Sequence, residues 1–292
     1  MIVDQMRHVP NAWIKRICKI IEPPKLIEWF FCFVVIFIII NNNKLNKNLK
    51  IYGKYCKSIW TSKGWSTTYP PPTLLTSLYA AYNADNNVND VLNTYNGTAI
   101  GGLTYTTGKI NQAFQFNGTN SLVSLPTNSM KFTGDFSYSV WVNLSTISGY
   151  QILISNYMNA AGNDYGNYLI INPSGKLEFW GFAVSTNSFA MASLTTFNTN
   201  TWYHVSVTKS ASSVKIYVNG VLNITNSVGV PIVYFSTMNP AIGSLYKWNG
   251  SSSTYFISNG SKIDAVGIWN KELTQAEVTE LYNSGNGKQY PF

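Results

Sequence analysis

From Leu78 to the C-terminus, apolar and polar positions alternate with a period of two, the pattern of half-buried β-strands. Residues 136–144 place Phe, Tyr, Val, Val and Leu on one face and Ser, Ser, Trp and Asn on the other. Residues 202–208 and 213–219 show the same alternation. A turn pair that favours type I′ hairpins, Asn219-Gly220, follows the last of these runs. Many short strands separated by turns predict an all-β sandwich or barrel.

One helix is predicted near the C-terminus. Thr274 and Glu277 have the spacing of a capping box, in which each side chain satisfies a free amide of the first helical turn. Val278 and Leu281 follow on one face, and Gly285 stands where a C′ glycine is expected to end the helix.

The first 74 residues differ from the β region and divide into three segments. Residues 1–25 are basic, residues 26–40 (LIEWFFCFVVIFIII) are apolar apart from Glu28, and residues 41–74 form a polar, Lys-rich linker containing a Pro triplet. Fifteen helical residues span about 22 Å, whereas a bilayer core is about 30 Å thick. An uncleaved N-terminal anchor helix is the favoured interpretation, which predicts a membrane-anchored or extracellular, surface-exposed protein. A degenerate signal peptide and a non-native extension of the reading frame are the alternatives.

Charge and cysteine are also confined to the N-terminal part. Residues 1–72 hold 11 Lys and Arg against 3 Asp and Glu, a net charge of +8, whereas residues 73–292 hold 9 of each. A nucleic-acid-binding domain would carry basic charge on its fold, so we expect no nucleic-acid partner. All three cysteines precede residue 73, and residues 75–292 are therefore expected to form one domain without disulfide bonds.

Four stretches in order resemble the laminin G-like family, the concanavalin A-like lectin/glucanase jelly rolls. They are LYAAYNADNNVNDVLNTYNGT (78–98), GKINQAFQFNGTNSLVSLP (108–126), FSYSVWVNL (136–144) with WYHVSVTKSASSVKIYVNG (202–220), and KIDAVGIWNKELTQAEVTELYN (262–283). The resemblance implies a two-sheet antiparallel jelly-roll sandwich with one short C-terminal helix, preceded here by the apolar anchor helix. It also implies binding rather than catalysis.

Many members of this family hold a structural Ca²⁺, a cation that prefers several hard oxygen ligands. The matching acidic positions in this sequence are Asp90 and Asp264, while Asn117 replaces an acid that is common in the family. The resemblance thus implies a Ca²⁺ site at Asp90 and Asp264. The alternative is that Asp90 caps a turn and Asp264 anchors a strand end.

No catalytic constellation is recognised, and we expect no enzymatic activity. The enzymes of the superfamily place acids at alternate positions of one strand, whereas Glu178 stands alone on its strand. His204 is expected to be a packed or surface residue of a strand. A divergent glycoside hydrolase using Glu178 is the least favoured alternative.

Two segments, taken as loops, combine aromatic rings with amide and carboxylate groups, the chemistry of sugar binding. The first is 156–167 and the second 245–256, and the resemblance places both at one rim. Their candidate ligand-binding residues are Tyr157, Asp164, Tyr165, Tyr246, Trp248 and Asn249. Trp141 and Trp202 are expected on the non-core side of their strands, where they would line a concave face.

These observations predict a non-catalytic module that binds carbohydrate or another surface polymer, outside the cell or on a virion. The alternative is a structural or adhesive appendage domain, of a virion or an envelope, that binds protein partners.

Overall fold

The computed structural model describes residues 73–160, 162–183, 188–228, 230–245 and 255–292. The predicted anchor at residues 26–40 lies outside these ranges. No helix within them is long and apolar enough to cross a membrane. The strands are β1 (Leu78–Tyr82), β2 (Thr98–Ile100), β3 (Thr104–Thr107), β4 (Gln112–Gln115), β5 (Leu122–Ser124), β6 (Phe136–Asn143), β7 (Gln151–Ala160), β8 (Asn163–Ile171), β9 (Lys176–Ala183), β10 (Phe189–Thr196), β11 (Trp202–Lys209), β12 (Ser213–Val218), β13 (Val221–Ser227), β14 (Ala241–Ile242), β15 (Ser244–Leu245), β16 (Tyr255–Phe256) and β17 (Lys262–Trp269). Short 3-10 turns at Thr73–Leu75 and Asn283–Gly285 and the helix α4 (Gln275–Tyr282) complete the described part.

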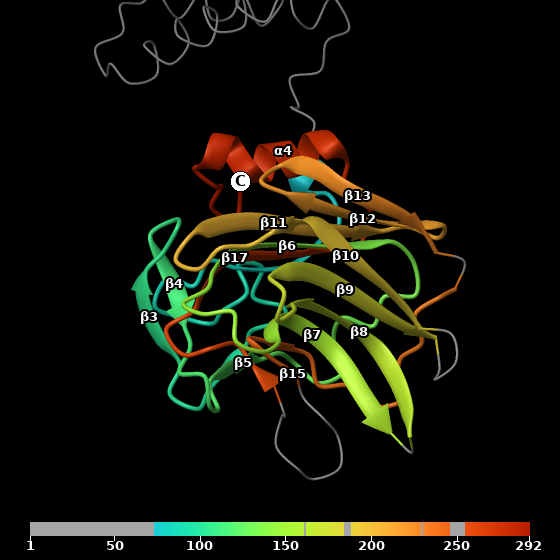
Figure 1. The fold of residues 1–292 in the computed structure, drawn as a ribbon, viewed down its shortest axis with the longest axis horizontal. Coiled ribbons are helices and arrows are strands. Elements are labelled where there is room, and N and C mark those ends of the chain that lie inside the picture. The colour runs from blue at the N-terminus through green and yellow to red at the C-terminus, as the bar shows by residue number, and fades with distance from the viewer. Residues whose placement is uncertain (1–72, 161, 184–187, 229, 246–254) are drawn as a thin grey trace, which may run out of the picture. The chain divides into compact units, whose positions relative to one another are not determined.

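The strands form two large antiparallel sheets that face each other (Figure 1). The first sheet has the order β13-β12-β11-β6-β17-β4-β3, with β1 paired to β17. The second sheet has the order β10-β9-β8-β7-β14-β5-β2, and β15 and β16 make a separate two-stranded ribbon. The predicted all-β, two-sheet antiparallel sandwich is therefore confirmed.

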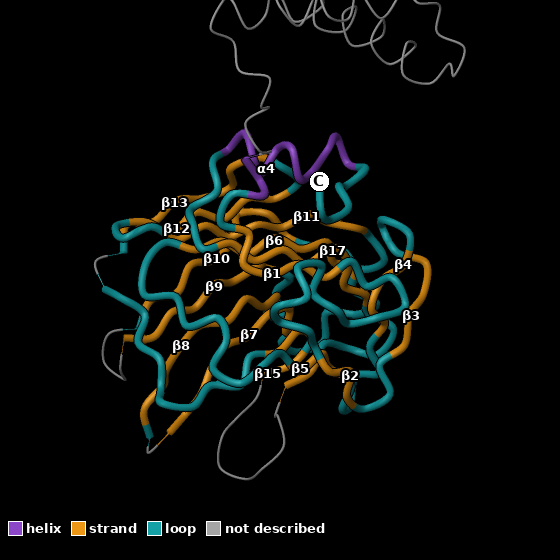
Figure 2. Tube along the Cα trace, turned by 180° about the vertical axis from the view of Figure 1, so that it is seen from behind, coloured by secondary structure: helices purple, strands orange, loops and turns teal. Residues whose placement is uncertain are grey.

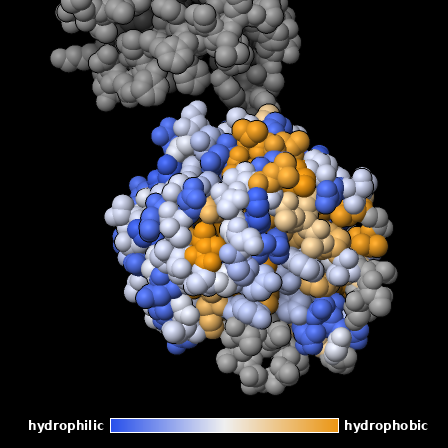
Figure 3. Space-filling view, in the orientation of Figure 1, coloured by the Kyte–Doolittle hydropathy of each residue, from blue (hydrophilic) through white to orange (hydrophobic). Residues whose placement is uncertain are grey.

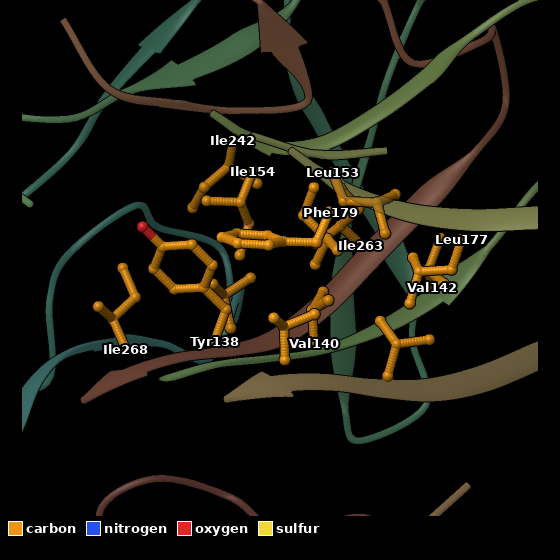
Figure 4. Packing of buried hydrophobic residues seen from close by; sticks show 14 of the residues in the cluster. Tyr138, Val140, Val142, Leu153, Ile154, Leu177, Phe179, Ile242, Ile263 and Ile268 are labelled. Atoms are coloured by element: carbon orange, nitrogen blue, oxygen red, sulfur yellow. The ribbon is translucent and has the colours of Figure 1, made fainter. Parts of the chain in front are cut away.

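The main core lies between the two sheets, where the alternating apolar faces meet. Figure 4 shows Tyr138, Val140 and Val142 of β6 opposite residues of β7 and β9 such as Leu153 and Phe179. Each of these five side chains is at most 1% exposed. The face that the sequence assigned to the core of β6 is thus confirmed. The predicted hairpin is also present, because Asn219 and Gly220 have φ values of 50° and 77°.

The central part of the opposite face of the first sheet is buried as well, because α4 and the C-terminal segment lie across it (Figures 1 and 2). Trp141 is 3% exposed and its ring stacks 5.8 Å from that of Tyr282 in α4. The expectation that Trp141 lines an open concave face is wrong, since the helix covers it. Trp202 packs against the same apolar cluster and is only partly exposed.

The short C-terminal helix forms as predicted, but it ends earlier than the glycine suggested. Thr274 accepts a hydrogen bond from the Glu277 amide at 3.3 Å, and Glu277 accepts one from the Thr274 amide at 2.8 Å. The left-handed residue that ends α4 is Asn283, with φ 49°, two positions before Gly285. Asparagine adopts this conformation more easily than other residues with a side chain, so the helix does not need Gly285 to stop.

Candidate functional site

The outer face of the second sheet carries a cluster of four aromatic rings. It is formed by Tyr157 of β7, Tyr168 of β8, and Trp180 and Phe182 of β9. Alternate residues of one strand share a face, so Trp180 and Phe182 lie parallel, with ring centroids 6.2 Å apart and planes 17° apart. Tyr168 lies within 6.1 Å of both rings and 5.4 Å from Tyr157. We call these four residues the aromatic platform.

Two carboxylates border the platform, and each accepts hydrogen bonds from one platform residue and one asparagine. Glu178 accepts hydrogen bonds from Trp180 Nε1 at 2.9 Å and from Asn172 Nδ2 at 2.6 Å. Asp164 Oδ1 accepts from the Tyr157 hydroxyl at 2.5 Å and from Asn159 Nδ2 at 2.7 Å. A carboxylate has about four acceptor positions, so both groups retain capacity for further donors.

Burial, together with the nearby carboxylates, raises the pKa values of the tyrosine hydroxyl groups of the platform. Burial, reinforced by hydrogen bonding and charge from Asp164, raises the pKa of the Tyr157 hydroxyl above its ordinary value. Burial also raises the pKa of Tyr168, and the charges of Asp164 and Glu178 add to that effect. Both tyrosines therefore remain neutral hydrogen-bonding groups in the physiological range.

Small neighbours leave one flank of the platform open. On β10, Ala190 stands opposite Trp180 and Ala192 opposite Glu178, and both alanines are exposed. On the other flank, the β15–β16 ribbon packs on β7, with Leu245 in contact with the aromatic cluster. Trp180 and Tyr168 are themselves partly exposed. The arrangement offers flat apolar rings beside hydrogen-bond acceptors, which suits a ligand with an apolar face and hydroxyl groups at its edge.

The prediction that residues 156–167 form a loop is wrong, since these residues belong to the β7–β8 hairpin. The segment is rich in polar residues, but two of them point into the core of the sandwich. Asn156 Nδ2 donates to the Met130 carbonyl at 2.8 Å, and Asn167 Oδ1 accepts from the Tyr138 hydroxyl at 3.0 Å. Buried amides with such partners are compatible with an inner strand position.

The candidate ligand-binding residues separate in the structure. Tyr157 and Asp164 lie together on the outer face, as described above. Tyr165 lies on the opposite face of β8, where its ring contacts Phe235 at 5.2 Å. The remaining three candidates, Tyr246, Trp248 and Asn249, lie outside the described residues.

Sequence reasoning missed the main part of the platform. Tyr168, Trp180 and Phe182 were not among the candidates, although Glu178, Trp180 and Phe182 alternate along one strand. A side-chain pattern with period two, followed along 176–183, was the signal that would have found Trp180 and Phe182.

Asp90 has no acceptor position left for a cation. Its carboxylate accepts the backbone amides of Ala81 at 2.9 Å, Leu92 at 3.2 Å, Thr94 at 3.1 Å and Tyr95 at 3.0 Å. These four donors occupy the acceptor positions of both oxygens, so Asp90 holds the turn after β1 and does not fit a Ca²⁺ site.

Asp264 differs because one of its oxygens is unused. Oδ2 accepts the amides of Lys109 and Ile110, each at 2.8 Å, whereas Oδ1 is buried without a hydrogen-bond partner. Burial, opposed by these amides, raises the pKa of Asp264 to about 7. Within the described ranges, no three His, Cys, Asp or Glu side chains are grouped to hold a metal ion. A Ca²⁺ contact at Asp264 stays a prediction.

His204 is a packed strand residue, as expected. Its Nε2 lies 2.8 Å from the Ser139 hydroxyl, and its ring lies 5.2 Å from that of Trp141 beneath α4. Burial lowers the pKa of His204 to about 3, so the ring is neutral. Because the ring is 1% exposed, a substrate has no access to this Ser–His pair.

A separate apolar patch lies where the edge strands β10 and β13 meet (Figure 3). It contains Leu194, Val221 and Leu222, which are 68%, 67% and 44% exposed. The three residues of this patch include neither aromatic rings, which form the platform, nor carboxylates, which border it. We therefore place the candidate site at the platform.

Comparisons with known proteins agree with this architecture. The sequence profile of the family described as the concanavalin A-like lectin/glucanases superfamily matches residues 117–279, more than half of the chain. No curated protein sequence matches the chain.

Similar folds occur in solved carbohydrate-binding and toxin domains. Domain 4 of AbnA, an extracellular GH43 arabinanase from Geobacillus stearothermophilus solved with arabinotriose, is 23% identical with a TM-score of 0.55; the match covers 70% of this chain and 97% of that one. The binding domain of Paraclostridial mosquitocidal protein 1 is 17% identical with a TM-score of 0.57, covering 73% and 53%. A botulinum neurotoxin type C structure, whose description concerns interaction with two ganglioside molecules, is 20% identical with a TM-score of 0.53, covering 73% and 52%. This chain spans about half the length of these two toxin structures.

Proposed function

Because the chain belongs to the concanavalin A-like lectin/glucanase superfamily, we propose that it is a non-catalytic module that binds carbohydrate through the aromatic platform of β7, β8 and β9. The observation that carries the proposal is the partly exposed Trp180 ring beside the carboxylate of Glu178. A sugar ring has an apolar face that stacks on an indole and edge hydroxyls that donate to carboxylates.

The surroundings of Glu178 support binding rather than hydrolysis. Glycoside hydrolysis uses one carboxyl group as an acid and a second as a nucleophile or base. Glu178 is engaged by Trp180 and Asn172, and Asp164 by Tyr157 and Asn159, so each carboxylate is fixed by one platform residue and one neighbouring asparagine. Such fixed acceptors orient a ligand.

A similar fold in an extracellular enzyme, solved with arabinotriose, supports an extracellular or surface-exposed location and a glycan partner for this chain. We include these in the proposal. Anchoring through residues 26–40 is part of the same hypothesis, because a tethered module would keep its parent surface close to a glycan.

The test is glycan binding by the full chain and by a Trp180→Ala variant. An array of neutral oligosaccharides, including arabinotriose, cellotriose, maltotriose and chitotriose, is followed by isothermal titration calorimetry on each positive. Loss of a buried aromatic contact at the centre of a binding site costs about 2 kcal/mol, so affinity should fall about 30-fold.

Two variants control for unrelated effects. Trp180→Phe keeps an aromatic face and should retain most of the affinity, and Leu222→Ala removes an exposed apolar side chain away from the platform and should change nothing. Absence of binding to every glycan, or unchanged affinity in Trp180→Ala, would contradict the proposal.

A further inference from the structure

The charges of the platform point to the kind of sugar that it accepts, an inference that rests on the proposed function and deepens it. Among the described residues of β7–β10, the charged side chains are Asp164, Lys176 and Glu178. Both acids border the aromatic rings through hydrogen bonds to Tyr157 and Trp180.

Lys176 lies beyond Glu178 as seen from the rings. It is two positions from Glu178 on the same face of β9 and four positions from Trp180, which is about 13 Å along a strand. Its ammonium donates to the Leu194 carbonyl on β10. No ion pair joins Lys176 to Glu178 among the described residues.

The two carboxylates border opposite ends of the platform. Glu178 precedes Trp180 by two residues on β9, and Asp164 stands beyond Gly166, the residue opposite Phe182 on the neighbouring β8. Their charges reach the rings between them, since both contribute to the raised pKa of Tyr168 after the larger effect of burial. A ligand that extends along the rings therefore approaches one negative group at each end.

We infer that the platform selects sugars without an acidic group, and that Asp164 and Glu178 are the residues that set this selectivity. A neutral sugar donates hydroxyl protons to the two carboxylates, and charged acceptors make these hydrogen bonds stronger than neutral ones. A sialic acid or uronic acid brings a third carboxylate, which has no donor to offer and is repelled by the nearer of the two. Like charges in juxtaposition are an effective means of excluding a wrong ligand.

The size of the effect depends on how near the carboxylate of the ligand comes to Asp164 or Glu178. A like-charged pair about 6 Å apart at a surface dielectric is disfavoured about 100-fold, and a larger separation or added salt reduces this. We expect a neutral glycan to bind at least about tenfold more tightly than its acidic counterpart at low salt. The difference should shrink as the ionic strength rises.

The experiment compares matched glycan pairs on the full chain. Lactose is paired with 3′-sialyllactose, and a galactose trisaccharide with trigalacturonate, each by competition against a bound neutral oligosaccharide. The same ratios are measured for Asp164→Asn, Glu178→Gln and the double variant, which keep the shapes and remove the charges. Lys247→Ala is included because residues 246–254 contain this one charged side chain and lie outside the described residues.

The expected result is a neutral preference of about tenfold or more that falls at least about threefold in the double variant and declines with salt. Equal or tighter binding of the acidic member would overturn the inference while leaving carbohydrate binding in place. A neutral preference that the double variant retains unchanged would also overturn it, because its origin would then lie elsewhere. Binding of no glycan by the wild-type chain would overturn the proposed function and this inference together.

Discussion

Replacement of Asp264 by Asn should stabilise the protein above neutral pH and leave its stability unchanged in acid. Asp264 is 0% exposed, and its Oδ1 has no hydrogen-bond partner. Burial, opposed by the amides of Lys109 and Ile110, raises its pKa from an ordinary value of 3.8 to about 7. Asparagine keeps an oxygen for the two amides and removes the buried charge.

The direction of this pH dependence follows from proton binding in the folded and unfolded states. A carboxyl group whose pKa is higher in the folded state than in the unfolded state favours folding while it is protonated. Its contribution is complete below about pH 4 and is lost as the pH rises through about 7. A tenfold change in the acid constant is worth about 1.4 kcal/mol, so the loss at pH 8 approaches about 4 kcal/mol. Because local relaxation lowers such costs, we expect the Asn variant to be about 2–4 kcal/mol more stable there.

His204 affects the same pH range in the opposite direction. Burial lowers its pKa to about 3, so the folded state loses stability as the pH falls below about 6.5. Both chains contain His204, and the difference between variant and wild type therefore isolates Asp264.

The assay is urea unfolding of both full chains at several pH values between about 4 and 8, with a calcium chelator present. The difference in unfolding free energy should be near zero at the acid end and should rise to its full value by the alkaline end. A variant that is less stable at every pH, or a difference that does not change with pH, would refute the reasoning. Repeating the series with Ca²⁺ tests the predicted cation contact, because only the wild type should then gain stability.

Two further substitutions test how local contacts hold the fold. Asp90→Ala removes an acceptor from four backbone amides around β1 and should cost about 3 kcal/mol or more in urea unfolding, whereas Asp90→Asn should cost less; equal losses would show that the carboxylate does not organise the turn. Thr274→Ala breaks the capping box of α4 and should cost about 1 kcal/mol by thermal unfolding, while the exposed neighbour Ala276, replaced by Ser, should change little; no loss in Thr274→Ala would mean that packing alone sets the helix start.

The strands with strict alternation were predictable, and those with buried amides were not. β6 shows Phe136, Tyr138, Val140 and Val142 on the core side, a pattern that only a strand explains. β7 and β8 instead place Asn156 and Asn167 toward the core. Their partners come from distant segments, so a single-sequence pattern cannot distinguish such a strand from a polar loop.

The burial of a strand face by a segment that is distant in the sequence cannot be predicted from the local pattern either. Ser137 and Ser139 alternate as a solvent face should, yet they are buried at 0% and 1% exposure. Ser137 donates to the Lys271 carbonyl and accepts from the Leu273 amide, both from the segment that leads into α4. The burial of this face, and with it that of Trp141 and His204, depends on where the helix docks.

The candidate site was only partly predictable for a related reason. Tyr157 and Asp164 were chosen for their sugar-binding chemistry, and the hairpin places them together. Tyr165 has the same chemistry but the opposite face, because a strand directs neighbouring residues to opposite sides. Trp180 was missed because its strand lies outside the two segments, 156–167 and 245–256, that were chosen for sugar-binding chemistry.

The most direct test of the central claim is the indole N–H spectrum of the full ¹⁵N-labelled chain during titration with the tightest-binding neutral oligosaccharide from the array. The Trp180 signal, identified with the Trp180→Phe variant, should shift saturably because its N–H donates to Glu178 at the platform. The signals of Trp141 and Trp269, buried on the α4 side, should not move. Saturable shifts at those two residues with an unmoved Trp180 signal would contradict carbohydrate binding at the platform.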